Sequence, residues 1–184
     1  IVDFFGSKLA KNNFSKKADL ILGNNVLAHV PDINDFIKGV KILLSSNGVN
    51  TFEFPHLCRL VEFKQFDTIY HEHFSYLSLT SLINIFDKQG LEIFDVQELN
   101  THGGSLRIFS KHKEDFSKKV QNSVLNILKK EKELGVDKIE YYSSFQPKVE
   151  LIKNEFLNFL ITAKNSNKKV VGYGAAAKGN TLLN

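Results

Sequence analysis

The sequence predicts an α/β protein, and three observations lead to this class. The run Ala18–Asn24 is short, apolar and bounded by charged and turn residues, as expected of a buried parallel strand. A helical pattern and a second strand-like segment at 49–54 follow it, which is the order of a right-handed βαβ unit. Segments 91–99 and 105–110 are also strand-like, and the glycine-containing turn between them predicts a hairpin.

The helix of the βαβ unit begins after Pro31. Asp32 and Asp35 lie in its first turn, where the helix dipole favours negative charge. Asn47-Gly48 is expected to end it. Its buried face carries apolar residues three and four apart: Ile33, Phe36, Ile37, Val40, Leu43 and Leu44.

A long connection with little periodicity covers residues 54–78. Connections of this length are usually functional or disordered, and the aromatic content of this one argues against disorder. The next helix is expected to have Thr80 as its cap and to end at Gly90.

The sequence changes in character after Glu114. An amphipathic helix is predicted to run from about Phe116 to Gly135. A second helix begins at Asp137, which has capping-box spacing to Glu140, and Pro147 is expected to kink or restart it. A final strand at 169–173 then runs into a glycine-rich turn. We therefore place a domain boundary near residue 112, between domains 1–112 and 113–184.

Composition excludes several classes of function. The formal charge of +4 is small, and the lysines lie on helical faces without interleaved aromatic residues, so no nucleic-acid partner is expected. A single cysteine excludes an intrachain disulfide framework and a cysteine-rich zinc site. No signal peptide or membrane-spanning stretch is present, which predicts a cytoplasmic protein with no membrane partner. The absence of methionine and the abrupt ends predict a fragment.

The segment Tyr70–Tyr76 combines groups that transfer protons near neutral pH, because histidine titrates at about 6.5. Three interpretations remain open for His71-Glu72-His73. The first is general acid–base catalysis, with one histidine as the base and Glu72 or Tyr70 orienting it. The second is a metal site, since His-x-His near carboxylates suits zinc, manganese or iron. The third is a surface loop with incidental histidines.

Polar residues also follow the first predicted strand. Asn24, Asn25 and His29 lie where ligands bind in open α/β sheets, beyond the carboxyl end of the strand. A capped turn into the next helix is an equally good explanation of them.

Two glycine-containing turns are further candidates. His102 precedes Gly103 and Gly104, which would let a ligand approach the backbone closely or would simply form a hairpin turn. The motif that begins Gly172-Tyr173-Gly174 and includes Lys178 suits a phosphate better than a nicotinamide dinucleotide, because its spacing departs from the dinucleotide fingerprint.

Four motifs in register resemble the nucleotide-sugar C-methyltransferases of deoxysugar biosynthesis. These enzymes use S-adenosylmethionine (SAM) to methylate a sugar carbon next to a ketone. The resemblance implies a Rossmann-like class I methyltransferase sheet, of which 1–112 would be the C-terminal half, and a C-terminal α/β domain beginning in 113–184. The motifs are NNVLAHVPD (24–32), YHEHFSYLS (70–78), THGGSLR (101–107) and GYGAAAKGNTLLN (172–184).

The resemblance also implies roles for matching residues. His73 would be the general base, with Tyr70 and Glu72 beside it and His29 facing the same carbon. Asn24 and Asn25 would lie near SAM. The nucleotide sugar would contact residues of the two glycine turns: His102, Gly103, Gly104, Gly172, Gly174 and Lys178.

Zinc is expected only in an N-terminal module that this sequence lacks, and this fragment alone is expected to be inactive. Two other functions remain open. One is a non-catalytic module that binds nucleotide sugars or serves assembly, and the other is a metal-dependent enzyme that uses His71 and His73.

Overall fold

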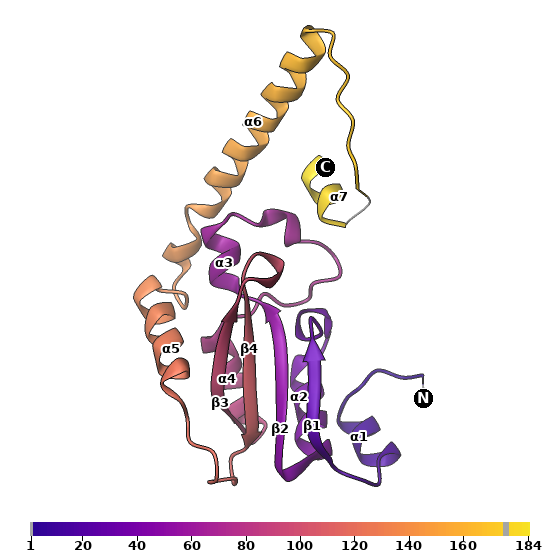
Figure 1. Ribbon diagram of the computed structural model, residues 1–184, viewed down its shortest axis with the longest axis vertical. Helices are drawn as coiled ribbons and strands as arrows, with labels where there is room; N and C mark the ends of the chain where they lie inside the picture. Colours follow the sequence, from indigo (N-terminus) through magenta and orange to yellow (C-terminus); the bar gives the residue numbers. More distant parts are fainter. Residues whose placement is uncertain (1, 175–176) are drawn as a thin grey trace.

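A mixed four-stranded sheet lies at the centre of the protein (Figure 1). The computed structural model describes residues 2–174 and 177–184. The strand order is β1-β2-β4-β3, in which β1 and β2 are parallel and the other neighbours are antiparallel. This arrangement confirms the α/β class, the βαβ order and the hairpin. The prediction that the first strand is buried is wrong, because β1 lies at the edge of the sheet and exposes Leu20 and Leu22. The strands are β1 (Ala18–Asn24), β2 (Leu44–Pro55), β3 (Leu91–Leu99) and β4 (Ser105–His112).

The βαβ unit differs from the prediction at the end of its helix. Helix α2 (Ile33–Leu43) begins as expected, with the Asp32 side chain accepting a hydrogen bond from the Asp35 amide at 3.0 Å. The prediction that Asn47-Gly48 ends the helix is wrong, because β2 begins directly at Leu44. The pairing of β1 with β2 is irregular here, so Asn47 and Gly48 lie in a bulge of the strand.

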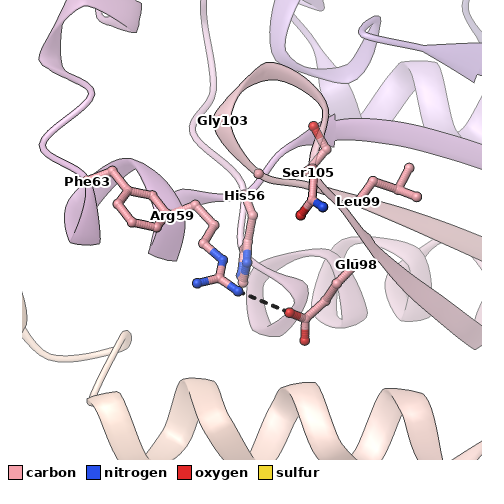
Figure 2. Close-up of a pocket in the computed structure, with 9 residues that line it drawn as sticks. His56, Arg59, Phe63, Glu98, Leu99, Gly103 and Ser105 are labelled. Carbon is pink, nitrogen blue, oxygen red and sulfur yellow. Dashed lines mark hydrogen bonds and ion pairs between the residues drawn. The ribbon is translucent and has the colours of Figure 1, made fainter.

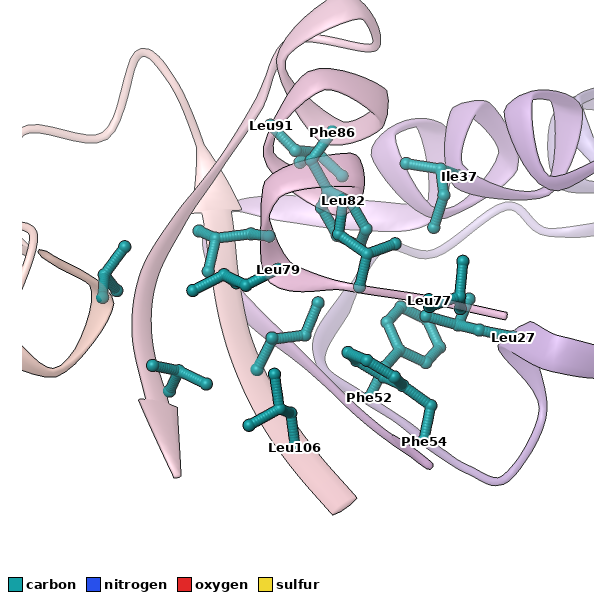
Figure 3. Close-up of a cluster of buried hydrophobic side chains, with 14 of the residues drawn as sticks. Leu27, Ile37, Phe52, Phe54, Leu77, Leu79, Leu82, Phe86, Leu91 and Leu106 are labelled. Atoms are coloured by element: carbon teal, nitrogen blue, oxygen red, sulfur yellow. The ribbon is translucent and has the colours of Figure 1, made fainter. Parts of the chain in front are cut away.

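The hydrophobic core lies between one face of the sheet and helices α2, α4 (Leu79–Lys88) and α5 (Asn122–Leu134) (Figure 3). Phe52, Phe54 and Phe86 are fully buried in it. Burial of side chains of this size stabilises the fold by about 1.5–3 kcal/mol each. Val124 and Ile127 place α5 in the same core, although α5 follows the predicted domain boundary.

The long connection from β2 to α4 is compact. It contains the short helices α3 (Leu57–Glu62) and η2 (Phe66–Thr68). The prediction that Thr80 caps α4 is wrong, because Ser78 is the N-cap and forms a capping box with Ser81. Thr80 instead lies inside the first turn.

The C-terminal part contains η4 (Ile139–Tyr142), α6 (Phe145–Asn165) and α7 (Ala177–Leu183). Pro147 lies in the first turn of α6, where its missing N–H is tolerated, so the helix restarts there. Asp137 makes no capping box, because Lys138 is the N-cap of η4. Phe116 precedes α5 and is exposed. The strand predicted at 169–173 is not formed, and no neighbouring strand pairs with these residues among those described.

One end of the sheet collects the segments singled out in the sequence. The carboxyl ends of β1, β2 and β3 meet there, together with η1 (Leu27–His29), α3 and the β3–β4 turn η3 (Thr101–Gly103) (Figure 1). Helix α7 lies beside η2 above the same end. The remaining helix, α1 (Ser7–Asn13), packs on α2. Within the described part of the chain, no helix is long and apolar enough to cross a membrane.

Candidate active site at the strand ends

The loop at Tyr70–Tyr76 is fixed to η1 by main-chain hydrogen bonds. The carbonyl of Ala28 accepts from the Phe74 amide at 2.8 Å and from the Ser75 amide at 3.3 Å. This contact brings the imidazole rings of His29 and His73 to a centroid separation of 4.7 Å. Two histidines that the sequence placed in different motifs therefore share one site.

Each of these histidines has its tautomer set by a carbonyl. The Nδ1 atom of His73 lies 2.7 Å from the Thr68 carbonyl, and that of His29 lies 2.9 Å from the Glu72 carbonyl. A carbonyl can only accept, so Nδ1 must carry the proton in both rings. The neutral rings then have a lone pair at Nε2, which is the form that a general base requires.

Two phenol rings surround His73. The ring of Tyr70 lies 4.5 Å from that of His73, and the ring of Tyr76 lies 6.0 Å from it at an interplanar angle of 88°. Burial raises the pKa of Tyr76 above its ordinary value, so this phenol remains a hydrogen-bond donor at neutral pH. Tyr76 was not among the predicted site residues, although its place in the same segment was a signal for it.

The other two members of the His-Glu-His run contribute less. Glu72 supplies its main-chain oxygen to His29, while its side chain is exposed. His71 is exposed as well. The Nδ1 atom of His73 already donates a hydrogen bond to the Thr68 carbonyl. If a metal ion were bound by His71 and His73, His73 could therefore coordinate it only through Nε2.

Asn25 and His102 form a second contact at the same end of the sheet. The Nδ2 amide group of Asn25 lies 3.2 Å from Nε2 of His102. The Oδ1 atom of Asn25 is buried and has no partner among the described residues, so it is available to a ligand donor. Asn25 has a φ of 55°, a conformation that asparagine tolerates better than most residues. Asn24 is exposed and lies opposite Glu53 in the parallel ladder.

Glu53 holds this second contact in place. Its side chain accepts hydrogen bonds from Thr101 Oγ1 at 2.8 Å and from Arg107 at 2.7 Å. Its main-chain oxygen accepts from the Asn25 amide at 2.8 Å. The hydrogen bonds from Thr101 and Arg107 lower the pKa of the Glu53 carboxyl despite its burial. We did not predict Glu53, because its side-chain partners Thr101 and Arg107 lie far away in the sequence and no local pattern connects them.

The glycine pair of the β3–β4 turn packs closely on neighbouring side chains. Added Cβ atoms would lie 2.3 Å from Gln65 at Gly103 and 2.6 Å from Arg59 at Gly104. A cavity of about 210 Å³ adjoins the turn, and Figure 2 shows Arg59 reaching across it to Glu98 at 3.2 Å. The positive φ values of both glycines and the contact of Gly104 with Arg59 give each glycine a structural reason, and the substrate contact expected of them stays a prediction.

The C-terminal glycine turn lies in the open. Cβ atoms at Gly172 and Gly174 would meet nothing within 4 Å. Lys178 is half-buried on α7. The substrate contacts expected of these three residues stay a prediction.

A cavity of about 590 Å³ opens beside His29. Phe5 and Phe36 supply apolar surface, and Asp32 and Asp35 supply negative charge. Among the described residues, no lysine or arginine lines it. The cavity therefore suits a ligand that is partly apolar and carries positive charge.

One group of potential metal ligands lies elsewhere, at the base of α3. Potential ligand atoms of His56, Cys58 and Glu131 lie within 4.8 Å of one another. The Glu131 carboxylate accepts four hydrogen bonds, from His56, the Leu79 amide, and the amide and hydroxyl of Thr80. Burial raises the pKa of Cys58 to about 12, so its thiol stays protonated at neutral pH. We interpret the group as a hydrogen-bonded anchor.

Comparison with known proteins gives two adjacent family matches. Residues 5–96 match the model of a methyltransferase domain, and residues 100–184 match that of the C-methyltransferase C-terminal domain. The C-methyltransferase NovU of Streptomyces niveus is 36% identical over 166 residues, which cover 90% of this chain. The chain spans 39% of the length of that relative.

Solved structures are similar over about half of the chain. A SAM-dependent methyltransferase from Clostridium acetobutylicum is 11% identical, with a TM-score of 0.45, over 56% of this chain and 62% of its own. A possible histamine N-methyltransferase from Thermotoga maritima is 19% identical, with a TM-score of 0.44, over 55% of this chain and 60% of its own.

Proposed function

Because the chain belongs to the SAM-dependent C-methyltransferases, we propose that the whole protein methylates a carbon next to the ketone of a nucleotide-linked sugar. The observation that carries this proposal is the tautomer of His73. Its Nδ1–H is committed to the Thr68 carbonyl, and its Nε2 lone pair is free to take a proton.

Methylation at carbon requires a nucleophilic carbon, and His73 is placed to generate one. Nε2 of His73 removes the proton from the carbon next to the ketone, and the C–H electron pair forms an enolate. A positioned base of this kind contributes about 10²–10⁴-fold to the rate. His29 packs against His73 and restricts its ring orientation.

The negative charge that develops on the ketone oxygen needs hydrogen-bond donors. Tyr70 and Tyr76 both lie against the His73 ring, and the raised pKa of Tyr76 keeps its proton on the phenol. We assign the two phenols to this oxygen. Preorganised donors of this kind typically contribute about 10²–10³-fold each.

The residues present fit a sulfonium cofactor. SAM supplies an electrophilic methyl group on positively charged sulfur. The cavity beside His29 offers aromatic surface with three aspartates, and the unpartnered Oδ1 of Asn25 can accept a hydrogen bond from an ammonium group. We propose that Asn24 and Asn25 face the cofactor and that His102, Gly103 and Gly104 face the nucleotide sugar, with Gly172, Gly174 and Lys178 near its phosphates.

The proposal separates into two measurable steps. The full-length protein should catalyse loss of deuterium from the carbon next to the ketone of a keto-deoxysugar nucleotide when no SAM is added. With SAM present, mass spectrometry should detect a product heavier by one methyl group. Deuterium retention together with no methylation, across a panel of thymidine- and uridine-linked keto-sugars, would exclude the proposed function.

A further inference from the structure

Glu131 joins α5 to both loops of the candidate site. Its side chain is 1% exposed, on a helix whose other charged residues face solvent. Residues 100–184 match the C-terminal domain, whereas the partners of Glu131 lie within 5–96. The contact therefore crosses between the two matched regions.

The first branch of this contact leads to the loop that carries His73. The Leu79 and Thr80 amides donate to the two oxygens of Glu131 at 2.8 and 2.7 Å, and the Thr80 hydroxyl donates at 2.6 Å. These residues follow directly after the segment that ends at Ser78. The carboxylate therefore fixes the downstream end of that loop.

The second branch passes through His56. Its Nε2 lies 2.8 Å from Glu131, and its amide donates to the Gly104 carbonyl at 3.0 Å. The Leu57 amide donates to the Leu77 carbonyl at 2.9 Å. The ring of His56 binds Glu131, while the main chain of His56 and Leu57 is held to the glycine turn and to Leu77, which follows the His73 loop.

Helix capping alone does not account for a carboxylate here. Ser78 already caps α4 through the Ser81 amide at 3.2 Å. Burial raises the pKa of Glu131, but the hydrogen bonds from His56, Thr80 and Leu79 outweigh it and hold the pKa below its ordinary value. The ionised carboxylate can therefore accept all four donors at once.

We infer that Glu131 is a positioning residue for the proposed methylation: from the C-terminal region, it holds the His73 loop and the glycine turn in the geometry that the reaction requires. The inference rests on the proposed function for its catalytic consequence. Its structural consequence can be measured without any reaction.

The test compares Glu131→Gln with Glu133→Gln in the full-length protein. Glu133 lies on the same helix, is 65% exposed at its side chain and, among the described residues, forms one ion pair, at 3.9 Å from Lys129. In Glu131→Gln we expect kcat per folded molecule to fall by about 10- to 100-fold, the loss that a displacement near 1 Å produces, while KM changes less than about twofold. Glu133→Gln should match the wild type.

A second readout does not depend on activity. Amide exchange at Phe74 and Ser75 and the imidazole NMR signal of His73 should change in Glu131→Gln and not in Glu133→Gln. Unchanged exchange and an unchanged His73 signal would overturn the inference even if methylation is never detected. If Glu131→Gln fails to fold, Thr80→Val, which removes only the hydroxyl donor, should show the same changes in smaller degree, and their absence would overturn it equally.

Discussion

The rings of His29 and His73 lie 4.7 Å apart, and each donates its Nδ1–H to a main-chain carbonyl. A pair of imidazoles with the same tautomer places two Nε2 lone pairs in one site. The site therefore offers a bound molecule two nitrogen acceptors side by side.

We expect His73→Asn to lower methyl transfer by the full-length protein by about 10²–10⁴-fold, because the proton acceptor is lost. Binding of SAM, measured by calorimetry, should stay within about threefold, since the change leaves the cavity beside His29 intact. The matched control is His71→Asn, which alters an exposed neighbour. Equal turnover by His73→Asn and His71→Asn would exclude His73 as the base.

We expect heteronuclear NMR of the neutral imidazoles to find the proton on Nδ1 in both His29 and His73. Their carbonyl partners, at 2.9 and 2.7 Å, require it. The imidazole of His71, which is exposed, serves as the internal reference in the same spectrum. A proton on Nε2 of His73 would contradict the proposed base.

We expect Glu53→Gln to destabilise the protein at neutral pH by about 1.5–3 kcal/mol, the range for hydrogen bonds to a charged group. The folded-state pKa of Glu53 is lowered from 4.5. Its stabilisation is therefore complete above pH 4.5 and is lost as the pH falls through the folded-state pKa. Urea unfolding measured at a series of pH values should show the unfolding free energies of the wild type and Glu53→Gln converging as the pH falls.

The control for that series is Glu155→Gln, which changes an exposed carboxylate on α6. It should leave unfolding unchanged from neutral to acid pH. A constant difference in unfolding free energy between the wild type and Glu53→Gln at every pH would show that the charge of Glu53 does not contribute to stability.

We expect Gly104→Ala to cost about 1–3 kcal/mol of unfolding free energy, because Gly104 has a φ of 116° and its Cβ would lie 2.6 Å from Arg59. Gly172→Ala is the matched control, since its Cβ meets nothing within 4 Å. Similar denaturation midpoints for the two variants would contradict the close packing of the β3–β4 turn.

Local patterns were sufficient to predict the strands. Ala18–Asn24 and Leu91–Leu99 have the predicted bounds, because turn or charged residues flank each of these strand-like segments. The end of α2 was missed, since the bulge at Asn47-Gly48 depends on pairing with β1. The strand predicted at 169–173 is not formed, because a strand needs a neighbour to pair with, and periodicity along one segment cannot show whether such a neighbour exists.

The site could be predicted only in part. The proton-transfer groups were visible as residue types, and His29, His73 and Tyr70 do lie together. The anchors were not visible, because Glu53 and Glu131 act through contacts with distant parts of the chain. The domain division at residue 112 and the roles of the site residues stay predictions.

The attachment of the His73 loop through the Ala28 carbonyl has a consequence for how freely this protein can vary. Both bonds come from main-chain amides, those of Phe74 and Ser75, so the side chains at these two positions have no part in the attachment. Proline is the one residue that cannot supply such an amide. A library randomised at Phe74 and Ser75 should therefore tolerate most residues and reject proline, which makes these positions a suitable place to alter substrate preference without moving the base.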